Sequence, residues 1–348
     1  MEPSLSNRLA QTLQAIDRRN IDTFHVVMLP DFFVDHFVSM ESVEKTCASV
    51  NALSAQGGGN LPGIPQQVCQ GGNAANTALA LACLGVSSHL ICHTDPLGMY
   101  LLQFFLGKHK VDLSGVKTTG KLAITTALEF RENHANVMIG DPGSVADFSF
   151  DLLDAHDQRC ITSADIVGVV NWNLNSCGTM LAKKIFETAK KEGVKTFFDS
   201  GDPSPRISDI PELITQVLRN PGLDIFGLNE NELRYYSNIS GTSQEDVIRG
   251  VSQLKKQISA RIDLHTDRFS CSMGDTLTVV PATSLPAIYR STGAGDAWNA
   301  ANLFAELFGF ENDERLLFAN MAAGLYISAP EPIHPTIDMV LNSIKKTL

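Results

Sequence analysis

The sequence predicts an α/β fold, in which helices cover both faces of a mainly parallel β-sheet and a small β element projects from it. The main observation is a regular alternation of strand-like and helix-like segments between residues 165 and 266. Such alternation is typical of a parallel sheet with helices on both faces. The second observation is a set of polar, strand-like segments earlier in the chain that do not follow this alternation. With 348 residues, 44% of them hydrophobic, the chain can form one large core.

Short apolar runs and longer amphipathic runs define the alternating elements. They are, in order, a strand at 165–172, a helix at 178–193, a strand at 195–200, a helix at 209–220, a strand at 223–229, a helix at 243–257, a strand at 260–266 and a further strand-like run at 284–289.

The first part of the chain supplies the remaining elements. They are an amphipathic helical extension within about 1–20, strands at 24–29, 34–40 and 87–92, a loop at 54–63, and helices at 73–85 and 98–110. Two strand-like runs around the polar tip 131–136 predict a hairpin. We interpret the polar strands, drawn from about 31–70 and 120–142, as a lid on a single domain that covers 1–348.

Composition excludes several classes of partner. The net charge of −11 disfavours binding to nucleic acid and to anionic membrane surfaces. The seven cysteines are odd in number and include no C-x-x-C pair, which argues against a disulfide framework or a zinc site and favours the reducing cytoplasm. No run approaches the roughly 18 apolar residues of a membrane span. We therefore expect a cytoplasmic protein without nucleic-acid or membrane partners.

The run STGAGD, residues 291–296, directly precedes a predicted helix. Glycines let the backbone approach a ligand, and the free amides at a helix start attract an anion. We therefore predict that the amides of Gly293, Ala294 and Gly295 hold a phosphoryl group. Asp296 would then accept the proton of an attacking hydroxyl. A carboxylate in a first helical turn also favours the helix dipole, so a purely structural role stays open.

Two further segments place polar side chains at helix starts. Gly71 and Gly72 precede a helix from which Asn76 projects, and asparagine suits sugar hydroxyls because it both donates and accepts hydrogen bonds. Asn229 and Glu232 lie three residues apart and share one helical face, where they can hold the water shell of Mg²⁺. Simple helix caps explain both patterns equally well. The run 199–206, DSGDPSPR, is best interpreted as a polar turn.

In this order, four segments together resemble the PfkB (ribokinase-like) family of carbohydrate and nucleoside kinases. The resemblance extends from about Phe24 to Ala329. Its segments are GGNAANTALALACLG (71–85), TDPLGMYLLQFFLGKHKVDLSGV (94–116), LNENE (228–232) and STGAGDAWNAANL (291–303). It implies a three-layer α/β/α sandwich with a mainly parallel central sheet and a small β-sheet lid.

The resemblance also implies an activity, namely ATP-dependent transfer of the γ-phosphoryl group to a hydroxyl of a sugar or polyol. Asp296 would be the base and the amides of 293–295 the anion hole, with Asn229 and Glu232 organising Mg²⁺ through water. The substrate would be held by Gly71, Gly72, Asn76 and Asp35. Nucleotide contacts are implied for Asn229, Thr266, Arg268, Thr292 and the helix at 318–330, which carries Ala319 and Asn320. The resemblance further allows a homodimer formed through the lid.

Two departures from the family pattern bear on the site. Arg290 replaces the first aspartate of D-T-T-G-A-G-D, a position that helps to build a monovalent-cation site in some members, which puts K⁺ activation in doubt. Thr266-Asp267-Arg268 replaces T-x-G, and Arg268 would contact phosphate instead.

Two alternative functions stay open. A nucleoside kinase would need an apolar shelf for the base, for which Phe32, Phe33 and Phe37 are candidates. A non-catalytic sensor would explain the departures at 290 and 267–268, although retention of Asp296 argues against it.

Overall fold

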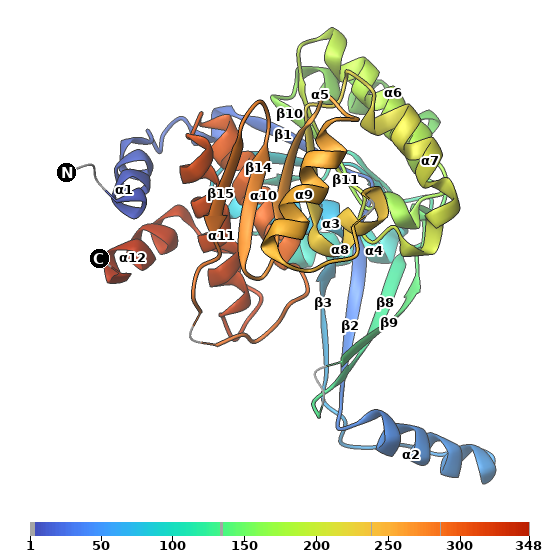
Figure 1. Ribbon diagram of the computed structural model, residues 1–348. Helices are drawn as coiled ribbons and strands as arrows, with labels where there is room; N and C mark the ends of the chain where they lie inside the picture. Colours follow the sequence, from blue (N-terminus) through green and yellow to red (C-terminus); the bar gives the residue numbers. More distant parts are fainter. Residues whose placement is uncertain (1–3, 133–134, 238, 286, 348) are drawn as a thin grey trace.

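The computed structural model describes residues 4–132, 135–237, 239–285 and 287–347. The first three residues of the predicted N-terminal extension, and residues 133–134 of the predicted hairpin tip, lie outside this range. At the centre is a nine-stranded sheet in the order β15-β14-β13-β12-β11-β10-β1-β4-β6 (Figure 1). All strands from β13 to β6 in this order run parallel, whereas β14 pairs antiparallel with both β13 and the edge strand β15. The strands are β1 (His25–Leu29), β4 (Ser87–Leu90), β6 (Val111–Asp112), β10 (Ile166–Val169), β11 (Lys195–Asp199), β12 (Ile225–Asn229), β13 (Arg261–His265), β14 (Phe269–Met273) and β15 (Leu277–Pro281).

Helices cover both faces of this sheet, which confirms the predicted sandwich. Alternate residues of β1 enter different cores: Val26 and Met28 pack on one side, Val27 and Leu29 on the other. The first side is covered by α1 (Leu5–Ala15), α3 (Asn73–Cys83), α4 (Pro96–Leu106), α10 (Ala294–Leu307), α11 (Asn312–Ile327) and α12 (Ile337–Thr347). The second is covered by α5 (Ala155–Ser163), α6 (Gly178–Lys191), α7 (Ile210–Leu213), α8 (Glu230–Tyr236) and α9 (Gln244–Lys255). No described helix has the length and apolarity needed to cross a bilayer.

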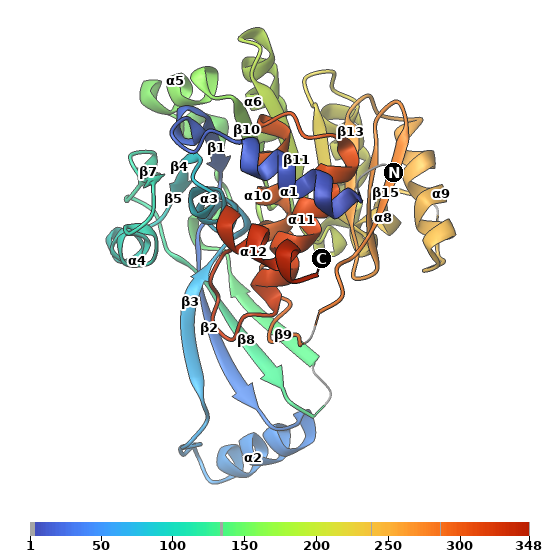
Figure 2. The same cartoon turned by 90° about the vertical axis from the view of Figure 1, so that its left-hand side faces the viewer.

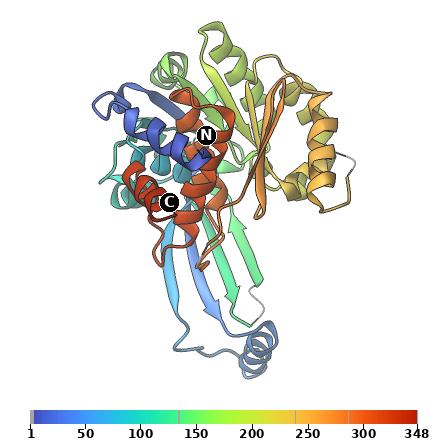
Figure 3. The ribbon, with the colours of Figure 1, turned by 60° about the vertical axis from the view of Figure 1, so that its left-hand side comes forward.

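The lid is a second, four-stranded sheet that projects from the body (Figures 2 and 3). Its order is β3-β2-β8-β9, with strands β2 (Phe33–Met40), β3 (Gln66–Gly71), β8 (Ala123–Phe130) and β9 (Ala135–Asp141). A helix at its far end, α2 (Val43–Ala55), was not predicted, and none of its residues is buried. Since α2 packs on no core, its sequence carries little amphipathic periodicity, which is the signal that reveals most helices.

The strand predicted at 284–289 is wrong for the described part of this run. Its residues follow β15 as irregular chain that packs against α11, where the Tyr289 amide donates to the Ile327 carbonyl at 2.9 Å. The side chain of Leu285 lies against Gly324 of the same helix. An apolar run can thus be buried against a helix as well as beside a strand, and periodicity does not distinguish the two.

A buried ionic network fixes α10 and α11 on the sheet. Asp263 of β13 accepts hydrogen bonds from Asn302 of α10 and from Arg315 of α11, both at 2.9 Å. Burial alone would raise the pKa of Asp263, but the guanidinium groups of Arg315 and Arg261 hold that pKa well below its usual range. Removing one partner of such a pair typically costs about 3–5 kcal/mol. The network therefore holds the middle of α10 and the start of α11 in defined positions relative to β13.

Candidate active site

Polar side chains gather at the carboxyl ends of the parallel strands, where ligands bind in open α/β sheets. Asp199, Asn229 and His265 are the last residues of β11, β12 and β13. A main cavity of about 450 Å³ opens between these strand ends, the lid and the start of α10. Among its lining residues are Phe33, Asp35, Gly72, Asn73, Asn76, Thr125, Met138, Asn171, Asn173, Asp199, Asp202, Asn229, Glu232, Thr292, Gly293, Ala294, Gly295 and Asp296. The structure thus brings residues from distant parts of the chain to one cavity.

The start of α10 depends on a glycine. Gly293 has φ of +80°, and a Cβ there would lie 2.7 Å from the Tyr326 hydroxyl. This position therefore needs both left-handed backbone and the absence of a side chain. The Ala294 amide donates to the Ser291 carbonyl at 3.2 Å, so one of the three predicted anion-hole amides has an internal acceptor. The amides of the first helical turn have no intrahelical acceptor, and that of Gly295 borders the main cavity.

Asp296 lies in this first turn and is buried at the base of the cavity. Its Oδ2 accepts a hydrogen bond of 2.9 Å from the Asn76 amide of α3. Burial raises the pKa of Asp296 well above its usual value, and the charges of Asp199, Asp31 and Asp35 act in the same direction. A carboxylate with a raised pKa is a stronger base than a solvated one, which is what proton abstraction at neutral pH requires.

At the start of α3, the backbone amides are bonded to a carboxylate of the protein itself. Asp31, which the sequence analysis did not select, accepts the backbone amides of Asn73 at 2.9 Å and Ala74 at 2.8 Å. It also accepts the side-chain amide of Asn171 at 2.7 Å. Gly72 has φ of +93°, and a Cβ there would lie 3.0 Å from the Asp31 carboxylate. The signal for Asp31 was its place directly after the first strand, four residues before Asp35.

Asp35 enters the main cavity from the lid strand β2. Its burial raises its pKa to about 6, against the effect of a hydrogen bond from Thr125 on β8. Gly71 makes room for it, because a Cβ at 71 would lie 2.2 Å from an Asp35 oxygen. Two lid strands and the chain before α3 thus present a carboxylate on the side of the cavity opposite β11–β13.

Asn229 and Glu232 form a capping box at the start of α8. The Asn229 side chain accepts the Glu232 amide at 3.0 Å, and Glu232 accepts the Asn229 amide at 2.9 Å. Burial raises the pKa of Glu232 well above its usual value, and the charge of Asp199 adds to this effect. Asn229 and Glu232 therefore cap α8 and also line the main cavity.

Together, these acidic residues fit a divalent cation. Asp199, Asp202 and Glu232 line one side of the main cavity. Burial also raises the pKa of Asp199. The ionised form of this carboxylate would be stabilised by a bound cation. Oxygen ligands of this kind, used directly or through water, suit Mg²⁺. Two residues of the run 199–206, which we predicted to be a polar turn, thus line the main cavity, and the place of this run after a strand was the available signal.

Asn171 and Asn173 face the same cavity from the segment after β10, and sequence analysis missed both. Asn171 adopts left-handed backbone, with φ of +55°, although it is not a glycine. Its side chain is held by Asp31, whereas the buried Oδ1 of Asn173 has no hydrogen-bond partner among the described residues. A buried polar atom without a partner is costly, so Asn173 is suited to accept a hydrogen bond from a ligand hydroxyl.

An apolar cavity of about 270 Å³ lies beyond the start of α10, between the 282–291 segment and α11. Thr266 and Asn320 line it, but both are internally bonded. Thr266 Oγ1 donates to the Phe269 carbonyl at 2.8 Å, and Asn320 accepts from the Trp298 indole at 2.9 Å. Ala319 is buried in the core. These residues shape the wall of the cavity and leave few polar groups free for a ligand.

Arg268 does not line either cavity. Its guanidinium donates to Glu230 at 3.1 Å and to the Thr242 carbonyl at 2.6 Å. The phosphate contact predicted for it would require both bonds to break.

Arg290 has a distinct environment next to the STGAGD run. Its guanidinium donates to the carbonyl oxygens of Ala329 at 2.9 Å and of Glu331 and Pro330, each at 2.7 Å, and to that of Tyr326 at 3.3 Å. Converging carbonyls are the oxygen ligands that a bound cation would take. A side chain of this protein supplies the positive charge there.

Comparisons with known proteins give a consistent result. Residues 63–339 match the pfkB family of carbohydrate kinases. The bifunctional protein HldE of Aliarcobacter butzleri is 20% identical over 322 residues, which are 91% of this chain but only 63% of that protein. The structure of Arabidopsis thaliana ribokinase complexed with ribose and ATP matches with a TM-score of 0.76, at 21% identity, over 92% of this chain and 98% of that one. Sinorhizobium meliloti adenosine kinase matches with a TM-score of 0.70, at 18% identity, over 93% and 99%. At these identities the structural likeness shows the fold.

Proposed function

Because the chain belongs to the pfkB family of carbohydrate kinases, we propose that it transfers the γ-phosphoryl group of ATP to a hydroxyl of a sugar or polyol. One observation carries this proposal: Asp296 is a buried carboxylate, bonded to Asn76, beside free amides at a helix start. This combination offers a base and an anion site to the same ligand.

In the proposed reaction the acceptor hydroxyl lies between Asp296 and the γ-phosphorus. Asp296 takes the hydroxyl proton as the oxygen forms its bond to phosphorus, and the bond to the β–γ bridging oxygen breaks to release ADP. The Gly295 amide and the N-terminal dipole of α10 stabilise charge on the phosphoryl oxygens. Asn76 holds the Asp296 carboxylate in place. Asp35, the Gly71–Gly72 backbone and Asn173 bind the other acceptor hydroxyls.

ATP and Mg²⁺ are part of the proposal. The apolar cavity by α11 would hold the adenine of ATP. The phosphates would then extend past Thr292 to the start of α10. Asn229, Glu232 and Asp199 would hold Mg²⁺, partly through water, and the ion would neutralise the phosphate charge. The Arg290 guanidinium would make activation by K⁺ unnecessary.

Three features of the lid and the cysteines extend the proposal. The lid excludes water from the cavity, which limits wasteful hydrolysis of ATP. It also exposes apolar side chains, among them Val68, Ile124 and Ile139, which would pair two copies into a homodimer. If the protein sediments as a monomer at all concentrations, no such homodimer forms.

All seven cysteines are free, which fits a cytoplasmic location.

A nucleoside acceptor is the second candidate. Phe33 and Met138 bring apolar surface to the main cavity, and Phe37 borders a smaller cavity under the lid. These side chains could stack on a base, whereas Phe32 is buried in the core.

The test is an ADP-release screen over sugars, polyols, sugar acids and nucleosides, with and without K⁺. We expect turnover with a small set of sugars or polyols and no requirement for K⁺. Turnover with nucleosides alone would establish the second candidate. ATP binding without phosphorylation of any acceptor would instead favour a non-catalytic sensor and overturn the proposal.

A further inference from the structure

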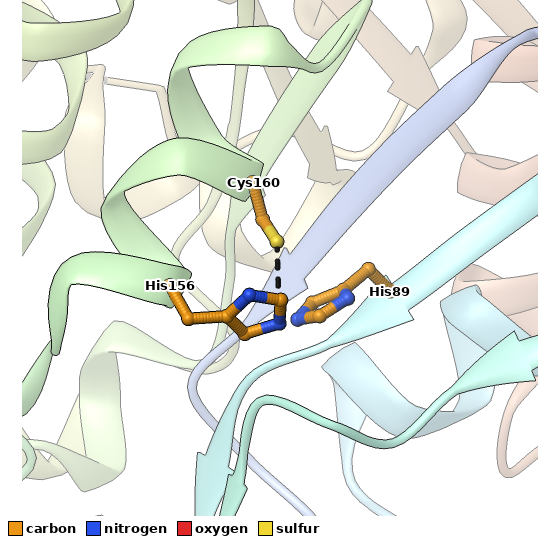
Figure 4. Close-up of side chains that lie close together, drawn as sticks. All are labelled: His89, His156 and Cys160. Atoms are coloured by element: carbon orange, nitrogen blue, oxygen red, sulfur yellow. Dashed lines mark hydrogen bonds between the residues drawn. The ribbon is translucent and has the colours of Figure 1, made fainter.

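Three side chains of metal-ligating types meet outside the active-site cavity. They are His89 of β4 and His156 and Cys160 of α5, whose ligand atoms all lie within 4.8 Å of one another (Figure 4). His156 and Cys160 are four residues apart, so they share one face of the helix. None of the three lines the main cavity. The cluster therefore needs an explanation separate from phosphoryl transfer.

His89 is fully buried, and its two ring nitrogens are unlike each other. Nδ1 lies 3.1 Å from the Asp112 carboxylate, whereas Nε2 has no hydrogen-bond partner among the described residues. A carboxylate oxygen accepts the hydrogen bond, so in a neutral ring Nδ1 carries the proton and Nε2 carries the free lone pair. Carboxylates orient metal-binding histidines in this way.

The chain around Gly115 keeps this lone pair accessible. A Cβ at Gly115 would lie 2.5 Å from His89 Nε2, so any other residue would fill the space in front of it. The neighbouring Ser114 hydroxyl lies 2.9 Å from Nε2 of His156. The same nitrogen lies 3.6 Å from the Cys160 sulfur. The open space is thus bordered by a lone pair, an imidazole and a thiol.

The local charge also suits a cation. Two carboxylates border the cluster, because Asp112 is bonded to His89 and Asp157 follows His156 in the chain. The positive charge of the nearby Lys117 is already neutralised, because Lys117 is paired with Asp154 and Asp157. A metal ion would displace the thiol proton and gain the thiolate as a ligand. The unsatisfied Nε2, which is costly when buried, would gain a partner at the same time.

We propose that His89 Nε2, His156 and Cys160 bind a borderline-soft divalent transition-metal ion, with Zn²⁺ as the representative. Two imidazoles and one thiolate are a ligand set that Zn²⁺ accepts, with water as the fourth ligand on the exposed side of His156. The ion would tie α5 to the interior of the sheet. Such a site would run against our expectation, based on the absence of C-x-x-C pairs, that the chain has no zinc site.

The test uses the full-length protein after removal of metal by a chelator. Zn²⁺ is titrated against a chromophoric competitor in excess Mg²⁺, which masks the oxygen-rich active site, and Co²⁺ serves as a spectroscopic probe. We expect one ion per chain, a thiolate-to-cobalt charge-transfer band and a rise in Tm with bound Zn²⁺. Cys160→Ser should abolish the band, and Asp112→Asn should weaken Zn²⁺ binding by about 10- to 100-fold.

The chain supplies a matched control. Cys83 and His109 form another thiol–imidazole pair at 3.6 Å, without a place in the three-residue cluster. Cys83→Ser should therefore leave the stoichiometry and the cobalt band unchanged. His156→Asn, at an exposed position, should lower affinity without unfolding the protein. Zn²⁺ binding that is unaffected by Cys160→Ser and His156→Asn, or no binding by the wild type, would overturn the proposal.

Discussion

The starts of α3 and α10 follow the same sequence pattern but differ in what their amides bind. Each helix begins after a glycine with positive φ, Gly72 or Gly293. At α3 the first amides are bonded to the Asp31 carboxylate of the protein itself. At α10 the adjacent carboxylate, Asp296, is part of the helix and is bonded to Asn76. The first helix start is therefore closed to an external anion, and the second is open.

This difference teaches that a glycine-rich helix start is not in itself an anion site. The deciding feature is whether another segment of the chain supplies a carboxylate to the free amides. Asp31, which follows β1, supplies such a carboxylate to the amides of α3. The same helix, α3, carries Asn76, which donates a hydrogen bond to Asp296 of α10. One helix thus positions the proposed base that the other presents to the main cavity.

The largest expected effect is that of Asp296→Asn, which keeps the shape of the side chain and removes the base. We expect kcat to fall by about 10²- to 10⁴-fold at unchanged folding, since general-base catalysis contributes about this much. Steady-state ADP release with the accepted substrate measures it. Asp338→Asn is the control, because Asp338 also lies in a first helical turn but is exposed. Equal turnover of Asp296→Asn and the wild type would disprove the mechanism.

The pH profile should carry the same signature. The raised pKa of Asp296 means that its carboxyl holds a proton above the usual carboxyl range. Only the ionised form accepts the substrate proton, so kcat/KM should rise with pH through this raised pKa and then level off. An acidic limb at the pKa of an ordinary aspartate, or none, would contradict the assignment.

Gly293→Ala should have the next largest effect. The new Cβ would meet the Tyr326 hydroxyl at 2.7 Å and would oppose the positive φ, so the amides of the first turn would move. A misplacement of about 1 Å can cost about 100-fold in rate, and we expect a loss of this size in kcat/KM for ATP. Gly309→Ala is the matched control, since Gly309 has φ of +65° but nothing within 4 Å of a Cβ. If both variants lose activity equally, backbone strain alone explains the loss.

Much of this comparison could be predicted from the sequence, and the remainder depends on tertiary contacts. Periodicity located the alternating strands and helices, and glycine followed by Asn76 or Asp296 marked both helix starts. Asp31 and Asn173 were missed because their roles depend on segments that meet only at the carboxyl ends of the strands. The α2 helix was missed because it buries no residue. The role of Arg290 was open because its four acceptors are backbone carbonyls, which no residue type reveals.

Arg290→Gln should have a smaller effect than Gly293→Ala. It removes the charge that ties the chain before Gly293 to the carbonyls of residues 326–331. We expect roughly a tenfold loss in kcat/KM for ATP, because hydrogen bonds to charged groups contribute about 1.5–3 kcal/mol each and only part of this holds the loop. Arg268→Gln, whose guanidinium contacts Glu230, serves as control. If the wild type requires K⁺, or Arg290→Gln is fully active without it, the guanidinium is not the cation of this site.

Asp31→Asn tests the closed helix start and should change turnover least. Three donors face the Asp31 carboxylate, and an amide at this position would turn its own N–H groups toward some of them. We expect the free energy of unfolding to fall by about 1–3 kcal/mol, as for a buried donor that loses its acceptor, measured by urea denaturation. The charge of Asp31 also contributes to the raised pKa of Asp296, so its loss should move the acidic limb of kcat/KM to lower pH. Asp95→Asn, at the N-cap of α4, should cost stability without this shift, because Asp95 does not line the main cavity. A large loss of kcat in folded Asp31→Asn would mean that the start of α3 takes a direct part in catalysis, and the distinction between a closed and an open helix start would fail.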